Sequence, residues 1–246
     1  MFDYQAPAHS LQDRIILITG AGAGIGRALA HACARQGATT ILLGRTVANL
    51  EQVYDEIEAI GGPRPAIFPL DLETAQEQDY QQLLQGIENE FGVLHGLVHN
   101  AGILGPRVPL QVYPLDAWKQ VMQINLNAAF ALTRQLLPLL QTADNASVVF
   151  TSSGVGRKVR AFWGAYAVSK AATEALMQVF HQELEQTSAI RINTVNPGAC
   201  ATAMRKKAYP AENPATLPQP EDIMAVYLYL LGRDSLGESG QAFDAQ

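Results

Sequence analysis

Short apolar runs alternate with longer amphipathic stretches along most of the chain, and this alternation limits the folds that the chain can adopt. The runs are rich in aliphatic and β-branched residues, which is typical of strands buried on both faces of a parallel sheet. The stretches between them carry apolar residues at helical spacing, and several end at glycine. The expected strands are residues 14–20, 39–45, 66–72, 96–102, 147–153 and 190–198. The expected helices are residues 27–37, 47–62, 74–92, 118–140 and 166–186.

Parallel strands need crossover connections, and helical crossovers cover both faces of the sheet. We therefore expect an α/β fold with a Rossmann-type, doubly wound parallel sheet in three layers (α/β/α). No shift in composition marks a second domain, so residues 1–246 are predicted to form a single domain. Residues 199–222 are irregular and carry four prolines, which is typical of a substrate lid or of a mobile segment.

Composition narrows the possible partners. The net charge is −6, so the chain gains nothing from counterion release on nucleic acid and is not attracted to anionic lipid. Cys33 and Cys200 are too few for a disulfide framework. The first residues lack the apolar run of a signal peptide, and no stretch approaches the about 18 apolar residues of a membrane span. A cytoplasmic protein with neither a nucleic-acid nor a membrane partner is expected.

A glycine-rich turn follows the first expected strand. It fits the pattern T-G-x-x-x-G-x-G through Gly20, Gly24 and Gly26, and it does not fit G-x-G-x-x-G. Glycines at these positions permit a tight turn and let the backbone approach a pyrophosphate at the N-terminus of the following helix. Taken alone, the turn is also compatible with a plain strand-to-helix connection.

Several motifs together resemble the short-chain dehydrogenase/reductase family over nearly the whole chain. They are RIILITGAGAGIGR, ILLGR, HNAGILG, VFTSSGVGR, WGAYAVSK and the ending FDAQ, and in detail they are similar to the YciK-like branch of bacterial oxidoreductases. The resemblance implies an oxidoreductase that transfers a hydride between a nicotinamide cofactor and a small carbonyl or alcohol substrate.

The resemblance also implies two sets of site residues. The catalytic set is Ser153, Tyr166, Lys170 and Asn125. The cofactor-binding set is Gly20, Gly22, Ala23, Gly24, Ile25, Gly26, Arg45, Asp71, Leu72, Asn100, Ala101, Gly102, Tyr166, Lys170, Pro197, Gly198 and Thr202.

Tyr166 and Lys170 are four positions apart, so they share one face of the expected helix. A free phenol has a pKa near 10, which is too high for efficient acid–base catalysis at neutral pH. A nearby ammonium group and the positive charge of oxidised nicotinamide favour the phenolate and lower this pKa. Tyr166 is therefore the candidate acid/base, although this spacing alone also fits an exposed helical pair.

The family assigns the neighbouring residues supporting roles. Lys170 would also hold the ribose of the nicotinamide. Ser153 lies thirteen positions before Tyr166, as the family's catalytic serine does, and would hydrogen-bond the substrate oxygen; Ser152 is the competitor. The backbone of Asn125 would hold a water that links the lysine to solvent.

Arg45 bears on the choice between NADP and NAD. It ends the second expected strand after Gly44, at a position where a carboxylate would bind both ribose hydroxyls of NAD. No acidic residue is present there, and a guanidinium suits bidentate recognition of a phosphate. NADP(H) is the expected cofactor, and a solvated surface arginine is the alternative.

Three features carry weaker signals. His95 and His99 lie around one strand, where four residues span about 13 Å, so they are not expected to share a metal. His99 also replaces the first asparagine of the family's N-N-A-G, which puts one cofactor-side hydrogen bond in question. The run at residues 205–207 (Arg-Lys-Lys) fits an acidic substrate or a solvated lid face equally well. The ending at residues 240–246 resembles the start of the family's last strand and then stops.

The favoured function is a carbonyl reductase or alcohol dehydrogenase. A non-catalytic NADP-binding sensor or scaffold is the alternative, and an epimerase or dehydratase of the longer branch is disfavoured by the glycine spacing. The substrate pocket is expected from residues 104–117, 154–163 and 199–222. Phe162, Trp163 and Tyr209 indicate an apolar pocket, and packing of the lid or of an interface is an equal alternative for them. A homodimer or homotetramer is expected because the helices at 118–140 and 166–186 carry more apolar surface than one sheet face needs.

Overall fold

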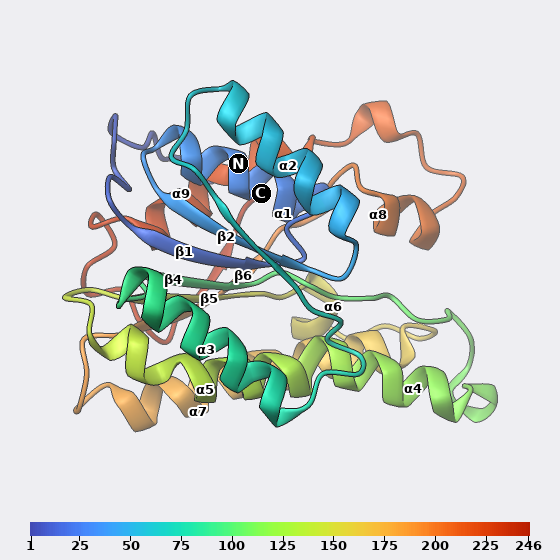
Figure 1. Cartoon of the computed structure of the whole chain (residues 1–246). Coiled ribbons are helices and arrows are strands. Elements are labelled where there is room, and N and C mark those ends of the chain that lie inside the picture. The colour runs from blue at the N-terminus through green and yellow to red at the C-terminus, as the bar shows by residue number, and fades with distance from the viewer.

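The computed structural model describes residues 1–246, and its sheet has seven strands that are all parallel (Figure 1). The strand order is β3-β2-β1-β4-β5-β6-β7, so the direction in which the chain adds strands reverses between β1 and β4. The bounds are β1 (Ile15–Thr19), β2 (Thr39–Gly44), β3 (Ala66–Pro69), β4 (Gly96–His99), β5 (Ser147–Thr151), β6 (Arg191–Asn196) and β7 (Ala242–Asp244). The doubly wound parallel sheet expected from the sequence is confirmed.

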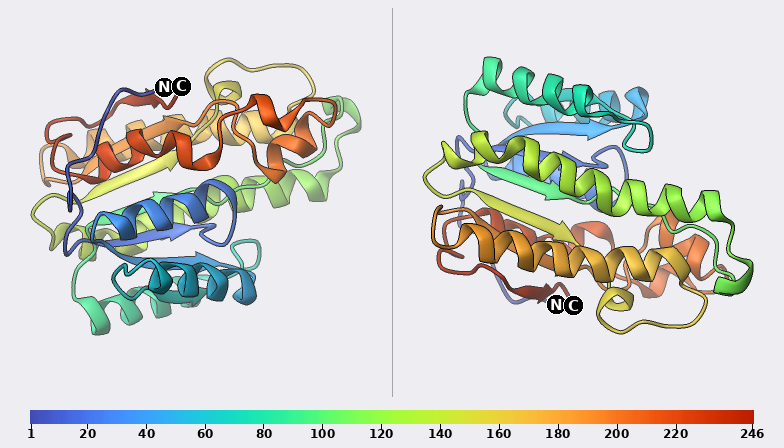
Figure 2. Two further views of the ribbon diagram at one scale, coloured as in Figure 1. Left: turned by 90° about the horizontal axis from the view of Figure 1, so that it is seen from above. Right: turned by 90° about the horizontal axis from the view of Figure 1, so that it is seen from below.

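Helices cover both faces of this sheet. One face carries α1 (Gly24–Arg35), α2 (Val47–Ala59) and α9 (Met224–Leu231). The other face carries α3 (Glu77–Phe91), α5 (Ala128–Gln141) and α7 (Gly164–Leu184). Figure 2 shows the first face from above and the second from below. No helix combines the length and the apolar character needed to cross a bilayer.

The three-layer arrangement explains why the strands are continuous apolar runs in the sequence. Successive strand residues point to opposite faces of a sheet. In β1, Ile16 and Ile18 enter the core beneath α1, whereas Leu17 enters the core on the α5 side. Leu29 of α1 and Leu132 of α5 pack against these two faces and are fully buried. Because both faces of β1 are covered, its successive positions 15–18 are all apolar.

The helix expected over residues 118–140 is confirmed, because residues 115–141 are helical throughout, but it contains a π-helical turn that the sequence did not indicate. The structure has α4 (Leu115–Met122), a π-helical turn η2 (Gln123–Asn127) and then α5. Apolar periodicity does not register a single turn whose hydrogen bonds are shifted by one residue. Such turns occur often at functional sites, and this one contains Asn125.

The carboxyl ends of the strands are overlaid by short elements. Residues 199–222 hold α8 (Ala203–Ala208) and the 3₁₀ turns η3 (Pro214–Thr216) and η4 (Pro220–Ile223). The neighbouring connections hold η1 (Leu110–Val112) and α6 (Gly154–Arg157). The two chain ends lie side by side at the edge formed by β7, where the Phe2 N–H donates to the Ala245 carbonyl at 3.0 Å (Figure 2).

Candidate active site

A cavity of about 340 Å³ lies at the carboxyl ends of the central strands, next to the point where the strand order reverses. Open parallel sheets bind ligands at this point, because the connections on either side diverge there. Most of the residues expected in the site line this cavity: Gly20, Ala23, Gly24, Ile25, Asn100, Ala101, Gly102, Ser153, Tyr166, Lys170, Pro197, Gly198 and Thr202.

The glycine turn forms one wall of the cavity. Gly20 and Gly24 have φ of +67° and +55°, which disfavours any residue with a side chain. Gly26 is packed so closely that a Cβ would lie 2.2 Å from the Gly20 carbonyl oxygen. The Asn100 side chain donates to the Thr19 and Gly20 carbonyls at 3.1 and 3.4 Å, and so braces the turn.

The N-terminus of α1 is open toward this cavity. Its N-cap residue is Ala23, which has no side chain to accept hydrogen bonds from the first turn. The first N–H groups of a helix have no partner within the helix and favour an anion. The Ser152 hydroxyl, also in the cavity wall, is buried without a hydrogen-bond partner. Backbone N–H donors at one end and an unpaired hydroxyl at the other fit a dinucleotide lying along the cavity.

A second hollow, of about 320 Å³, continues from the glycine turn along the ends of β2 and β3. It holds four more of the expected cofactor residues, Gly22, Arg45, Asp71 and Leu72, whereas Gly26 lines neither space. Arg45 is exposed and makes no ion pair, so its guanidinium is free to bind an anion. Asn49 lines the same hollow from the first turn of α2, and sequence reasoning did not identify it.

Tyr166 and Lys170 lie on one face of α7 in the wall of the main cavity. The Lys170 Nζ donates to the Thr151 carbonyl at 2.6 Å and lies 5.9 Å from the centre of the Tyr166 ring. Burial lowers the pKa of Lys170 to about 8, while the carboxylate of Glu174 opposes this shift. An ammonium held at this pKa changes its charge close to physiological pH.

The pKa of Tyr166 differs from the sequence expectation. Burial raises the pKa of its phenol, and the neighbouring Ser153 hydroxyl is the contact that lowers it. The expected depression therefore does not arise from the protein alone, because desolvation of the phenolate outweighs the favourable contacts. Of the two candidate serines, Ser153 is the one that acts on Tyr166.

Asn125 lies behind this pair and ties the π turn to the next segment. Its Oδ1 accepts from the Ile103 N–H at 2.8 Å, and its Nδ2 donates to the Ile103 carbonyl and to the Ser169 hydroxyl, both at 3.0 Å. Asn125, Lys170 and Thr173 line a small polar hollow of about 10 Å³. A space of this size and polarity suits a single buried water.

His95 and His99 are held at opposite ends of β4. The Nδ1 of His95 accepts from the Ile15 N–H at 3.0 Å. His99 stacks on Phe150 with ring centres 4.6 Å apart, and its Nε2 lies 2.8 Å from the Thr133 hydroxyl. Burial and the charge of Lys170 lower the pKa of His99 to about 3, so it is neutral. Its hydrogen bond is directed at α5 and not at the main cavity.

The outer end of the main cavity is formed by residues of the expected lid and of the adjoining loops. Leu104, Trp163, Met204 and Ala208 supply an apolar lining, and Tyr209 packs on Trp163 with ring centres 5.9 Å apart. Phe162, which was expected in the pocket, is 55% exposed and lines an adjoining hollow instead.

A family model described as short chain dehydrogenase matches residues 14–213. This match spans the glycine turn, the Tyr166–Lys170 pair and the strands that carry them. The chain belongs to the short-chain dehydrogenase/reductase family. It is an oxidoreductase of a family that binds nicotinamide dinucleotides.

Three relatives resemble this short-chain dehydrogenase over nearly their full length. The oxidoreductase YciK of Escherichia coli K12 is 50% identical over 243 residues, which cover 99% of this chain and 96% of YciK. A short-chain dehydrogenase structure from Pseudomonas syringae is 56% identical with a TM-score of 0.99, and 100% of each chain is covered. A Shigella flexneri structure, complexed with NADP, is 50% identical with a TM-score of 0.95 over 98% of this chain and 100% of the other.

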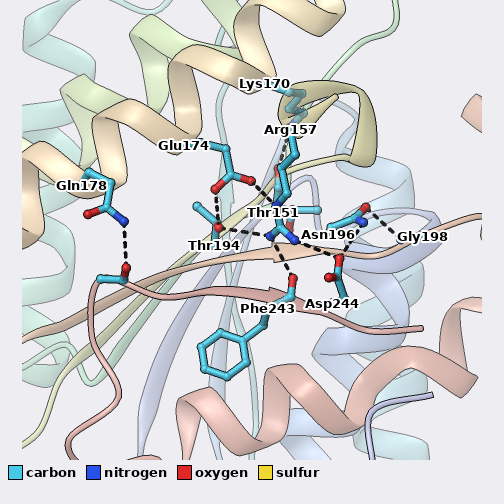
Figure 3. A network of polar contacts seen from close by, with 11 residues as sticks. Thr151, Arg157, Lys170, Glu174, Gln178, Thr194, Asn196, Gly198, Phe243 and Asp244 are labelled. Carbon is cyan, nitrogen blue, oxygen red and sulfur yellow. Dashed lines mark hydrogen bonds and ion pairs between the residues drawn. The ribbon is translucent and has the colours of Figure 1, made fainter. Parts of the chain in front are cut away.

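The sequence did not reveal a polar network that connects α6, α7 and β7 (Figure 3). Arg157 donates to the carboxylates of Glu174 and Asp244, both at 2.9 Å. Asp244 also accepts from the Asn196 amide at 2.8 Å, and the Asn196 side-chain oxygen accepts from the Gly198 N–H at 3.2 Å. The network therefore links the charge beside Lys170 to the loop after β6 that lines the main cavity.

Proposed function

We propose that this protein catalyses NADP(H)-dependent hydride transfer between the nicotinamide ring and a small carbonyl or alcohol carbon. The observation that carries the proposal is the placement of the Tyr166 phenol, next to Ser153 and one helical turn from Lys170, in the wall of the main cavity. A sensor or scaffold that binds NADP without turnover has no need for this arrangement.

In the reductive direction the cofactor supplies the hydride that adds to the carbonyl carbon. Tyr166 donates its phenolic proton to the carbonyl oxygen, so the product is a neutral alcohol and the residue is left as phenolate. The Ser153 hydroxyl donates a hydrogen bond to the same oxygen and stabilises its developing charge. The ammonium of Lys170 stabilises the phenolate and holds the ribose hydroxyls. Lys170, Asn125 and a water in the small polar hollow then return a proton to Tyr166 from solvent.

The decisive experiment is a panel of aldehydes and ketones incubated with the purified protein and NADPH. Oxidation of NADPH is followed by the loss of its absorbance, and formation of the alcohol is measured separately. Turnover of at least one compound with equal amounts of alcohol and NADP supports the proposal. Tight NADPH binding without turnover of any compound in the panel would favour the sensor or scaffold.

NADPH is expected to bind more tightly than NADH, because Arg45 is a free cation beside the hollow for the adenosine end. Replacing Arg45 with alanine should weaken NADPH binding about 10- to 100-fold, the range for hydrogen bonds to a charged group, and should leave NADH binding nearly unchanged. Fluorescence titration gives both dissociation constants. Arg35→Ala is the matched control, since Arg35 is an exposed arginine at the far end of α1. Equal binding of the two cofactors by the unaltered protein contradicts the assignment.

A homodimer or homotetramer is expected because α5 and α7 leave apolar side chains exposed on one face. Phe130 and Val179 are 45% and 52% exposed, and Phe130 stacks on Phe180 of the neighbouring helix. Pairing of these helices across a two-fold axis would bury this face in both subunits. Val179→Asp should shift the protein toward the monomer in light scattering, while Leu236→Asp, at another exposed site, should not. A monomer at micromolar concentration before any substitution would exclude the oligomer.

A further inference from the structure

The outer rim of the active-site cavity, with the hollow beside it, is lined by cations in a chain whose net charge is −6. Arg205 lines the cavity, and Arg107 and Lys207 line the adjoining hollow. No carboxylate lines either space. Cations lining such a space attract anions and raise their local concentration.

Arg107 is the cation that the fold holds in place and leaves available. Its guanidinium lies 4.5 Å from the centre of the Trp163 ring and 5.0 Å from that of Tyr209. It donates one hydrogen bond, to the Ala208 carbonyl. A guanidinium has five N–H donors, so most of them stay free, while contact with the two rings holds the group in place.

Arg205, on the same rim, differs from Arg107 because it is paired with a carboxylate. Both of its hydrogen bonds to Glu212 measure 2.6 Å, so its charge is neutralised within the lid. Its guanidinium also lies 3.9 Å from the centre of the Tyr209 ring. Arg205 therefore supports the lid, whereas Arg107 has no carboxylate partner.

Arg107 lines a hollow that adjoins the main cavity. This hollow measures about 380 Å³ and is also lined by Phe162 and Lys207. Leu104 and Ala208 line both spaces, so one opens beside the other. Trp163 connects the two sites, because its ring lies 5.9 Å from that of Tyr166 and 4.5 Å from the Arg107 guanidinium.

We infer that the substrate carries an anionic group, a carboxylate or a phosphate, which binds Arg107 and Lys207 in this hollow while its carbonyl lies at Tyr166. The chain of the substrate would cross the face of Trp163 between the two. This inference rests on the proposed function, since it assigns a substrate class to the same site. It also gives a role to part of the cationic run at residues 205–207.

The test compares matched pairs of substrates with the NADPH-loaded protein. The pairs are 5-oxohexanoate and 6-oxoheptanoate, each with its methyl ester, and a third arm uses 5-oxohexyl phosphate. We expect kcat/KM to be at least about tenfold higher for the acids than for the esters, and to fall with ionic strength for the acids alone. Comparison of the carboxylate with the phosphate identifies the anion that the hollow prefers. Equal rates for acid and ester, with no advantage for the phosphate, would overturn the inference.

Variants of Arg107 test the residue itself. Arg107→Met keeps much of the stem that packs on Trp163 and should bring the acid-to-ester ratio of kcat/KM close to one. Arg107→Lys should restore part of the ratio, and Arg35→Met should leave it unchanged. An acid preference that persists in Arg107→Met would show that this hollow does not hold the anion.

A binding measurement separates this inference from the proposed function. The same acids and esters are titrated into NADPH-saturated protein, and the fluorescence of NADPH is followed. If no compound is reduced but the acids bind and Arg107→Met weakens that binding, the anion site stands and the proposed chemistry fails. If the ketones are reduced without Arg107-dependent binding of the acids, the chemistry stands and the anion site is excluded.

Discussion

Replacing Tyr166 with phenylalanine should lower kcat at least about 10²-fold, and by as much as about 10⁴-fold, which is the usual contribution of a positioned acid. The substitution removes one oxygen and almost no volume, so folding and NADPH binding should be retained. Tyr80→Phe is a matched control, since Tyr80 is also buried with a hydroxyl that has no partner, and it lies on α3. A Tyr166→Phe variant with near-normal kcat on the best substrate of the panel would show that another group carries the proton.

The pH dependence of turnover distinguishes the acid from a residue that only shapes the cavity. Burial raises the pKa of Tyr166 and Ser153 lowers it. In Ser153→Ala the phenol should therefore lose its proton at higher pH, so the fall in reductive turnover at alkaline pH should move upward. The same variant should lose kcat through the missing hydrogen bond to the substrate oxygen, while its NADPH affinity stays unchanged. The profile is measured as kcat against pH at saturating NADPH.

The sequence predicted those strands, helices and turns whose conformation depends on residues close together in the chain. The strands followed from continuous apolar runs, because both faces of β1 and β5 are buried. The shared face of Tyr166 and Lys170 followed from helical spacing. The glycine turn followed from Gly20 and Gly24, whose positive φ suits glycine alone among the common residues.

Features that depend on distant residues could not be predicted in this way. Arg157 and Asp244 are separated by 87 positions, and each alone is indistinguishable from a solvated surface charge. The direction of the Tyr166 pKa shift depends on how deeply α7 and its neighbours bury the phenol, which spacing does not reveal. The π turn at Asn125 was missed because apolar periodicity does not distinguish one π-helical turn from an α-helical one.

The π turn and the network in Figure 3 approach Lys170 from different sides. Asn125 contacts the Ser169 hydroxyl, next to Lys170 in the chain, and Glu174 lies one turn further along α7. The Glu174 carboxylate raises the pKa of Lys170, and the two contacts from Arg157 and Thr194 hold that carboxylate in place. Because burial acts in the opposite sense, the charge on Lys170 depends on groups contributed by α6, α7 and β6.

Replacing Lys170 with methionine should lower kcat at least about 10²-fold and also weaken NADPH binding, since the phenolate and the ribose lose the same ammonium. Methionine has a similar length and suits a buried position, so the fold should survive; the thermal midpoint and the circular dichroism spectrum check this. A loss of kcat with full NADPH affinity would show that Lys170 does not bind the ribose. An unchanged kcat would show that Lys170 has no role in catalysis.

The pH dependence of NADPH binding gives a second test of the role of Lys170. Burial lowers the pKa of Lys170 from its usual value near 10.5 to about 8, so the ammonium is present below this pH and is lost above it. The dissociation constant for NADPH should therefore rise as the pH increases through about 8. In Lys170→Met the binding of NADPH should be weak at every pH, and the dissociation constant should show no rise near pH 8. A step of the same size in the variant would assign the titration to another group and leave Lys170 without a pH-dependent role in binding.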